Sequence, residues 1–249
     1  MPKNPILFFN DKDTIFQKTE FPKPFCFTKE VAGVFDDMIA RSVPLYHEVL
    51  KMTVQWATRH YQPDTTIYDI GVSTGTTLSL LTQSLPNARL IGIDNSQAML
   101  DKAREKLKPF LGTRSIKLIN DDARHHQYQH GSVVIANYTL QFIPVEDRVK
   151  LIKKIAGQMP PQGIFILSEK VKSPSDSIQE SMTHFYEEFK TASGYTRQEI
   201  AQKKEALENV LVSFTENAYR LLLTELGYSI CETVLRWNQF STMIAIKGK

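Results

Sequence analysis

The chain has 249 residues, of which 42% are hydrophobic and 23% charged, and its formal net charge is +3. These values are typical of one globular α/β domain spanning 1–249, and the charge is too small to favour nucleic acid as a direct partner. No apolar run approaches the roughly 18 residues of a membrane span, and Cys26 and Cys231 are too few for a disulfide framework. We therefore expect a cytoplasmic protein with no membrane partner.

The first 60 residues predict an irregular arm followed by helices. Residues 1–28 show little periodicity, and their aromatic side chains are expected to pack on the domain or on a partner subunit. Apolar residues recur at helical spacing from Lys29 to His60, and Pro44 interrupts them, which predicts two helices rather than one. The phenylalanines expected to pack in this way are Phe16, Phe21, Phe25 and Phe27.

A regular alternation of strands and helices follows. Strands are predicted at 66–70, 89–93, 116–120, 132–137 and 163–169, and helices at 76–84, 97–108 and 145–157. Ser96 is suited to cap the second of these helices. This rhythm predicts a parallel, doubly wound sheet of the Rossmann-like kind.

The rhythm breaks at 171–217, where the pattern is almost entirely helical. We expect an inserted helical cap over the carboxyl edge of the sheet, where open α/β sheets bind ligands. A helix at 216–226 and strands at 229–236 and 241–247 complete the chain. The short connection between these strands predicts a hairpin, so the last strand of a seven-stranded sheet is expected to run antiparallel.

The most informative motif lies at the end of the first strand. Residues 67–75 read Ile-Tyr-Asp-Ile-Gly-Val-Ser-Thr-Gly, and Asp94 ends the next strand about 20 residues further on. An ionised carboxylate only accepts hydrogen bonds, and a ribose diol offers two donors. The pair predicts a nucleoside site, although the glycines alone are equally typical of a plain strand-to-helix turn.

The motif also narrows the class of nucleoside. The dinucleotide fingerprint needs glycine at three positions, which here hold Gly71, Ser73 and Thr76, and no Gly-Lys pair follows Gly75 to form a P-loop. The remaining pattern resembles motif I of class I methyltransferases, which holds S-adenosylmethionine (SAM). Asp69 is placed to meet the ammonium of SAM, directly or through a water.

Further motifs make a closer resemblance. They are Arg41-Ser42-Val43-Pro44 with Tyr46, Ile93-Asp94-Asn95-Ser96, Asn137 with Thr139-Leu140-Gln141-Phe142, Leu167-Ser168-Glu169-Lys170, Phe189-Lys190, Gly194-Tyr195, Gln202-Lys203 and Leu207-Glu208-Asn209-Val210. With these motifs the chain resembles the carboxy-S-adenosyl-L-methionine (carboxy-SAM) synthase family over nearly its whole length. That family belongs to the class I methyltransferase superfamily and makes the carboxymethyl donor for wobble uridine modification of tRNA.

The resemblance implies a set of residues that contact SAM or carboxy-SAM. In the implied site Asp94 takes the ribose, Asp122 accepts from the adenine amino group, and Asn137 lies near the sulfonium. From the residues alone, Asn137 is more typical of a turn that closes a strand, and Tyr46 is more typical of a core aromatic. The matching positions are Tyr46, Gly71, Val72, Ser73, Asp94, Asn95, Asp122, Ala123 and Asn137.

The resemblance also implies a chemistry. The methyl group of SAM loses a proton, its carbon captures the carboxyl carbon shed by prephenate, and phenylpyruvate leaves. An arginine of the family's cap holds the new carboxylate, and Lys204 stands at that position. Lysine neutralises a carboxylate without the two parallel bonds of arginine. We therefore predict Lys204, Asn137 and Tyr46 as catalytic residues, with Lys203 as the alternative to Lys204, which otherwise is typical of a solvated helix face.

Other departures and alternatives remain open. Gln239-Phe240-Ser241-Thr242 replaces the Asn-Phe-Gly-Ser of the family's last hairpin. His125, His126 and His130 follow a strand but are interpreted as loop residues, so no metal is predicted. The family forms homodimers, and the arm and cap suit such an interface. Two other functions are possible on this scaffold: a methyltransferase for a small molecule, and a SAM-binding dimer partner without catalysis.

Overall fold

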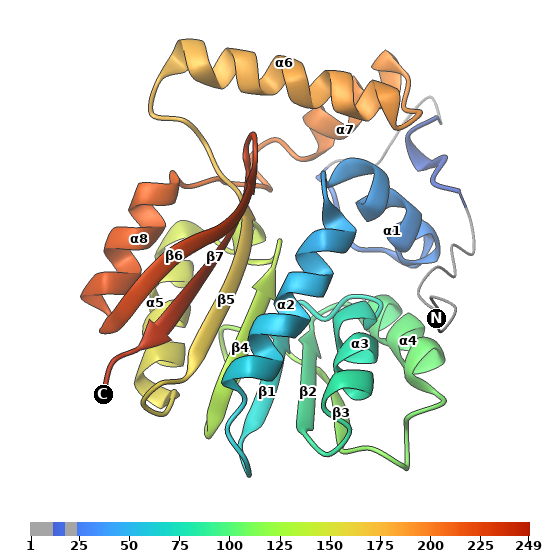
Figure 1. Cartoon of the computed structure of the whole chain (residues 1–249). Coiled ribbons are helices and arrows are strands. Elements are labelled where there is room, and N and C mark those ends of the chain that lie inside the picture. The colour runs from blue at the N-terminus through green and yellow to red at the C-terminus, as the bar shows by residue number, and fades with distance from the viewer. Residues whose placement is uncertain (1–11, 18–23) are drawn as a thin grey trace, which may run out of the picture.

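A computed structural model describes residues 12–17 and 24–249. Seven strands form one sheet in the order β3-β2-β1-β4-β5-β7-β6 (Figure 1). Strands β1 to β5 pair in parallel, and β7 runs antiparallel to both β5 and β6. This arrangement confirms the predicted Rossmann-like class I methyltransferase fold with an antiparallel last strand. The strands are β1 (Thr66–Ile70), β2 (Arg89–Asp94), β3 (Ile116–Asn120), β4 (Gly131–Asn137), β5 (Ile164–Lys170), β6 (Tyr228–Trp237) and β7 (Phe240–Lys247).

The helices follow their predicted patterns closely. Pro44 separates α1 from α2 as expected, and the Ser96 side chain accepts from the Met99 N–H at the start of α4, which confirms it as a cap. The α-helices are α1 (Lys29–Ser42), α2 (Tyr46–His60), α3 (Thr76–Ser84), α4 (Gln97–Leu107), α5 (Val145–Gln158), α6 (Asp176–Ala192), α7 (Arg197–Ala206) and α8 (Glu216–Glu225). Short 3-10 helices η1 (Ile15–Gln17) and η2 (Leu140–Phe142) complete the described set.

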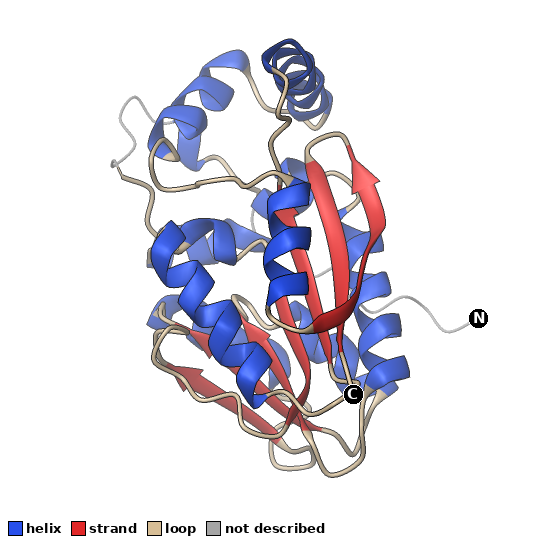
Figure 2. Ribbon diagram, turned by 90° about the vertical axis from the view of Figure 1, so that its left-hand side faces the viewer, coloured by secondary structure: helices blue, strands red, loops and turns tan. Residues whose placement is uncertain are grey.

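Helices cover both faces of the sheet because successive strand side chains point to opposite sides. In β4, Val133 belongs to a buried cluster with Leu78 of α3, whereas Val134 belongs to a second cluster with Ile152 of α5. All four side chains are fully buried. The two clusters cover the two faces of the sheet but not the carboxyl ends of its parallel strands. Helices α6 and α7 lie beyond these strand ends (Figures 1 and 2).

The segment 171–217 is less helical than predicted. Helices α6 and α7 account for 176–192 and 197–206, while 207–215 forms turns and an extended connection. Asn209 takes a φ of 59°, which no helix continues through. The Val212 N–H donates to the Gln141 carbonyl at 2.9 Å. This stretch is therefore hydrogen-bonded to the chain after β4 instead of continuing as a helix.

The described residues of the N-terminal arm, 12–17 and 24–28, pack on α1 and α7, as their phenylalanines predict. Phe16 and Phe25 are 1% and 7% exposed, and the Phe25 N–H donates to the Ala206 carbonyl at 3.0 Å. The predicted packing of Phe21 falls outside the described residues. The arm therefore closes one side of the space beneath α6 and α7.

None of the helices in the described ranges combines the length and apolar character that crossing a bilayer requires.

Candidate functional site

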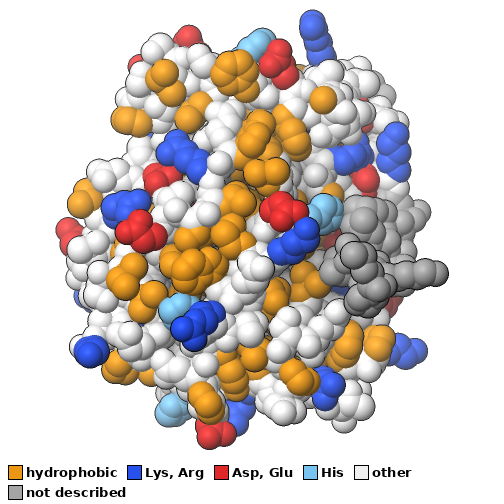
Figure 3. Space-filling view, in the orientation of Figure 1, with side chains coloured by type: hydrophobic (Ala, Val, Ile, Leu, Met, Phe, Trp, Pro, Cys, Tyr) orange, Lys and Arg blue, Asp and Glu red, His pale blue; other side chains and the backbone are white. Residues whose placement is uncertain are grey.

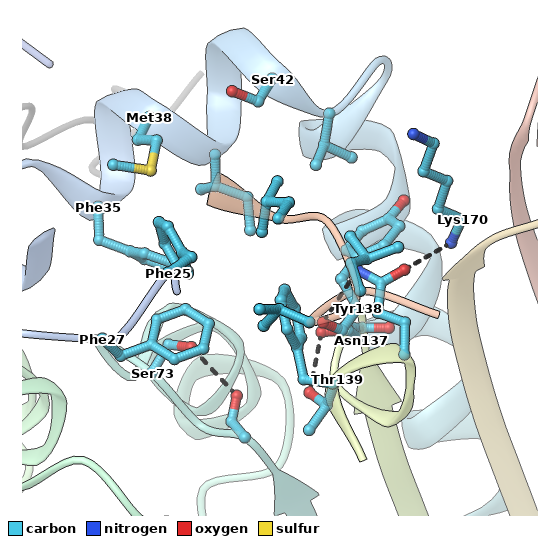
Figure 4. A pocket seen from close by; sticks show the side chains of 18 of the residues that line it. Phe25, Phe27, Phe35, Met38, Ser42, Ser73, Asn137, Tyr138, Thr139 and Lys170 are labelled. Carbon is cyan, nitrogen blue, oxygen red and sulfur yellow. Dashed lines mark hydrogen bonds between the residues drawn. The ribbon is translucent and has the colours of Figure 1, made fainter. Parts of the chain in front are cut away.

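A cavity of about 1110 Å³ lies between the carboxyl ends of the parallel strands and the helices α1, α6 and α7. Figure 4 shows the phenylalanines of the arm and α1 on one side of it and Asn137 with Lys170 on the other. Every residue that the sequence singles out for SAM, together with both candidate lysines, lines this one cavity. They are Tyr46, Asp69, Gly71, Val72, Ser73, Asp94, Asn95, Asp122, Ala123, Asn137, Lys203 and Lys204.

The turn after β1 needs its first glycine for two reasons. Gly71 has a φ of 70°, and a Cβ on it would overlap the side chain of Thr139. That threonine donates through Oγ1 to the Ile70 carbonyl at 2.9 Å, which fixes it against the turn. The other side of the turn is held by Lys106, whose Nζ donates to Thr76 at 2.6 Å and pairs with Asp36 of α1 at 2.7 Å. The turn is thus set before a ligand arrives.

Asp94 organises the end of β2. Its Oδ2 accepts the Ser73 N–H at 2.9 Å and its Oδ1 accepts the Ser96 N–H at 2.8 Å. Burial raises the pKa of the Asp94 carboxyl, and the two backbone bonds oppose that rise. Each carboxylate oxygen keeps a lone pair, so both can still accept from a diol.

Asp69 carries an unmatched buried oxygen. The side chain is 2% exposed, and Oδ2 has no hydrogen-bond partner among the described residues. Burial, followed by the nearby charge of Asp94, raises the pKa of Asp69 to about 8. A buried polar atom without a partner is uncommon and costs free energy. The cavity therefore fits a ligand that brings a cation to Asp69.

The expected adenine end contains an ion pair that the sequence did not suggest. Arg124 donates to Asp122 through Nε at 3.0 Å and Nη2 at 2.6 Å, and its hydrogen bonds hold the pKa of Asp122 below the usual range. Arg124 Nη1 also reaches Asp147 at 2.8 Å. Phe27 and Phe142 add an apolar wall, with ring centroids 5.3 Å apart. A planar base can lie on this wall beside an oriented carboxylate.

Asn137 is held by its neighbours at the end of β4. Its Nδ2 donates to Thr53 Oγ1 at 3.3 Å, and its Oδ1 accepts from Ser168 Oγ at 2.8 Å. The Ser168 hydroxyl also lies 3.0 Å from Thr242 Oγ1. These contacts fix the amide and leave its second N–H to the cavity. One interpretation of the sequence placed a turn at Asn137. The residue with the turn conformation is Tyr138, which has a φ of 57°.

Among the cavity residues that were not predicted, two carry buried polar atoms without partners in the described residues. The Tyr138 hydroxyl and the Gln239 Nε2 are buried without hydrogen-bond partners in the described part of the chain. Tyr138 has a positive φ, which a single sequence does not reveal for tyrosine. Gln239 belongs to the segment of the last hairpin that departs from the family's sequence. That departure was the signal in the sequence that could have indicated this residue.

Comparison with known proteins decides the family. A family model described as a methyltransferase domain matches residues 67–163. The carboxy-S-adenosyl-L-methionine synthase of Trichodesmium erythraeum is 45% identical over 240 residues, covering 96% of this chain and 95% of that protein. The synthase of Sulfurimonas denitrificans is 43% identical over 236 residues, covering 94% and 99%. The chain belongs to the carboxy-S-adenosyl-L-methionine synthase family.

Solved structures agree with the fold of this carboxy-SAM synthase family member. Magnesium protoporphyrin IX methyltransferase from Synechocystis PCC 6803 with bound S-adenosylhomocysteine has a TM-score of 0.62 at 17% identity, covering 85% of this chain and 87% of that one. An O-methyltransferase family protein from Burkholderia thailandensis has a TM-score of 0.61 at 16% identity, covering 91% and 65%. Family membership makes the chain a SAM-dependent transferase.

In this carboxy-SAM synthase family member the two cap lysines differ in their surroundings. Lys204, the lysine predicted from the sequence to hold the carboxylate, is 67% exposed at its side chain and lies 3.5 Å from Glu187 of α6. Lys203 is buried and donates from Nζ to Ser42 Oγ at 2.7 Å. Burial lowers the pKa of Lys203 to about 7. Lys203 is thus engaged with α1, and Lys204 is the lysine that can turn to a ligand.

Proposed function

We propose that the chain converts SAM and prephenate to carboxy-SAM and phenylpyruvate, for use in tRNA wobble uridine modification. The observation that carries the proposal is the 45% identity to a carboxy-SAM synthase over 96% of the chain. All the implied site residues face one cavity, which supports it. SAM fills part of a cavity of about 1110 Å³, and the rest is open to a second substrate.

The proposed reaction balances without an added oxidant or reductant. One C–H bond of the SAM methyl group breaks, as does the bond that joins the prephenate ring to its carboxyl group. A C–C bond forms between the methyl and carboxyl carbons. The ring hydroxyl leaves with the methyl proton as water, and the aromatised ring leaves as phenylpyruvate.

Each site residue has a proposed role. Asp94 accepts from the ribose hydroxyls, Asp69 accepts from the ammonium, and Asn137 directs its free N–H toward the reacting end. Tyr46, whose pKa burial raises, stays a neutral donor beside them. In this scheme the ammonium of Lys204 leaves the carboxylate of Glu187 and binds the new carboxylate of the product. Gly71, Val72, Ser73, Asn95, Asp122 and Ala123 complete the proposed SAM contacts.

The decisive experiment incubates the purified protein with SAM, with and without prephenate, and analyses the nucleosides by mass spectrometry. We expect a product heavier than SAM by one carboxyl group, formed only when prephenate is present. Tight binding of SAM that is returned unchanged contradicts the proposal. That result would favour a SAM-binding dimer partner without catalysis.

The runner-up function is methyl transfer to a small molecule. The names of the related proteins do not favour it, and lysine in place of arginine at 204 is its one motivation. It predicts that S-adenosylhomocysteine accumulates with an acceptor in the same incubation, whereas carboxy-SAM synthesis leaves no S-adenosylhomocysteine.

We also propose that the chain forms a homodimer in the cytoplasm. Figure 3 shows hydrophobic side chains in a band down the middle of one face. Leu45, Ile178 and Phe185 are 46%, 51% and 54% exposed, and apolar surface of this kind suits a partner subunit. Cys26 and Cys231 are free thiols, which supports a reducing compartment. Light scattering of the eluted protein at twice the 28.5 kDa chain mass is the expected result.

A further inference from the structure

Two lysines form a cationic wall in the half of the cavity beneath α6. Lys170 ends β5, and Lys190 lies near the end of α6. Their ammonium nitrogens lie 5.0 and 4.4 Å from the centroid of the Tyr186 ring. Neither ammonium has a hydrogen bond or an ion pair with the described residues, although Lys190 is only 5% exposed. Within the described ranges, no carboxylate therefore pairs with either ammonium.

The surroundings of the wall are short of negative charge. Burial first, and then the neighbouring ammonium groups, lower the pKa of Lys170 and of Lys190 to about 8. Glu187 opposes that shift, but its carboxylate already lies 3.5 Å from Lys204. Burying like charges without counterions costs free energy. An anionic ligand would remove that cost, since it supplies the missing partners.

A buried amide adds an independent sign of a ligand. Gln239 is 1% exposed and lines the same cavity, and its Nε2 has no partner in the described part of the chain. Its Oε1 lies 3.4 Å from Gln179 Nε2 on α6, which orients the amide. A donor held in this way in the same cavity as two ammonium groups is suited to a carboxylate oxygen.

An aromatic wall connects these groups to the reacting end. The Phe240 ring lies 5.0 Å from Tyr186 and 6.1 Å from Tyr138, measured between centroids. Tyr138 follows Asn137 in the chain, and its hydroxyl is one of the unpartnered cavity atoms. A ring-shaped molecule can therefore lie along this wall, with its charged groups at the lysines and its other end toward Asn137.

We propose that Lys170 and Lys190, with the Gln239 amide, bind the second substrate as a dicarboxylate that has an apolar ring. The proposal rests on the proposed function and gives it specificity-determining residues. Two ammonium groups match two carboxylates, whereas a monocarboxylate leaves one charge unmatched. Lys204 stays available for the carboxylate of the product, so the donor and the product use different cations.

The test compares Lys170→Gln and Lys190→Gln with Lys51→Gln. Lys51 lies on α2, is 60% exposed and pairs with Glu48, so its variant controls for loss of one charge. We expect each cavity variant to raise the KM for prephenate by about tenfold or more, since a charge-assisted hydrogen bond contributes roughly 1.5–3 kcal/mol. SAM affinity, measured by calorimetry, is expected to stay within about twofold. Lys190→Arg keeps the charge and should retain most of the prephenate affinity.

Equal losses of SAM and prephenate binding would overturn the proposal, because they would indicate a general change of the cavity. An unchanged KM in both cavity variants would overturn it as well. Circular dichroism and thermal melting of each variant separate a folding defect from a binding defect. If Lys→Gln variants do not fold, Gln239→Ala provides the readout, with an expected rise of several-fold in the KM for prephenate.

Direct binding separates this proposal from the proposed function. Prephenate is titrated into protein saturated with S-adenosylhomocysteine, so that no turnover is needed. Binding that Lys170→Gln and Lys190→Gln weaken, in a protein that makes no carboxy-SAM, supports the site and contradicts the reaction. If the protein makes carboxy-SAM but neither Lys→Gln variant changes the affinity for prephenate, the proposed binding site is contradicted and the proposed reaction is not. Phenylpyruvate, a monocarboxylate, is expected to bind at least tenfold more weakly, and equal binding of the two would overturn the dicarboxylate assignment.

Discussion

At the scale of single residues, the carboxyl group of Asp69 links ligand binding to stability. It is buried with one unpartnered oxygen, and burial raises its pKa to about 8. The folded chain without ligand therefore keeps a proton that the unfolded chain loses near pH 4. Stability from this group is present at low pH and falls as pH rises toward 8. A bound ammonium has the opposite effect on the pKa of Asp69, because it favours the ionised carboxylate.

Asp69→Asn should therefore separate stability from function. We expect the variant to melt higher than the parent at pH 8 in the absence of ligand, by about 2–4 °C for each kcal/mol recovered, and to bind SAM at least tenfold more weakly. Thermal melting and calorimetry measure the two effects. Asp64→Asn, at an exposed turn residue with a φ of 63°, is the matched control and should change neither. Unchanged SAM affinity in Asp69→Asn would contradict the ammonium contact.

Lys204 provides the second prediction at this scale. Lys204→Ala should weaken carboxy-SAM about tenfold and SAM much less, because only the product carries the extra carboxylate. Lys204→Arg should bind carboxy-SAM more tightly than the parent, since arginine offers two parallel N–H bonds. Calorimetry with both ligands on both variants gives the comparison. Equal losses for the two ligands in Lys204→Ala refute the role of this side chain as the carboxylate anchor.

At the scale of elements, sequence patterns predicted most of the fold because periodic burial and local capping are properties of short segments. The bounds of β1, α3 and β3 agree with their predicted ranges. The turns and extended connection at 207–215 could not be predicted, since a contact between Val212 and Gln141, far apart in the sequence, holds this segment. The same limit applied to the candidate site. Lys170 and Lys190 stood in quoted motifs, but only the packing of α6 against the sheet brings both over Tyr186.

The contact between α7 and α1 gives a prediction about an element interface. Burial lowers the pKa of Lys203 to about 7, so the folded chain sheds a proton that the unfolded chain holds up to about pH 10. The contribution of Lys203 to stability is therefore present above pH 10 and is lost as pH falls toward 7. We expect Lys203→Met to have a higher melting temperature than the parent at pH 7. This difference in melting temperature should become smaller as pH rises to 10.

The measurement is a melting series from pH 7 to pH 10 on the parent and the variant. Lys51→Met, at an exposed position on α2, is the control and should shift the curve by little at any pH. A parent that is equally or more stable than Lys203→Met at pH 7 would show that the bond to Ser42 outweighs the burial of the charge.

At the scale of the whole molecule, the cavity combines groups that respond to pH in opposite directions. Asp69 must be ionised to bind an ammonium, so SAM affinity should fall as pH drops below about 8. Lys170 and Lys190 must be protonated to bind a dicarboxylate, so donor affinity should fall as pH rises above about 8. Asp94 faces the first group, and Glu187, Lys203 and Lys204 face the second. They set these values jointly, and the apparent pKa values belong to the coupled groups.

Carboxy-SAM synthesis at low concentrations of both substrates should therefore follow a bell-shaped pH profile with its maximum near pH 8. The acid limb is measured as SAM affinity at each pH, and the alkaline limb as the KM for prephenate at saturating SAM. Asp69→Asn should flatten the acid limb and keep the alkaline one, because the lysines are untouched. Lys190→Gln should weaken the alkaline limb and keep the acid one. A single variant that moves both limbs equally would show that the two halves of the cavity do not act as separate binding sites.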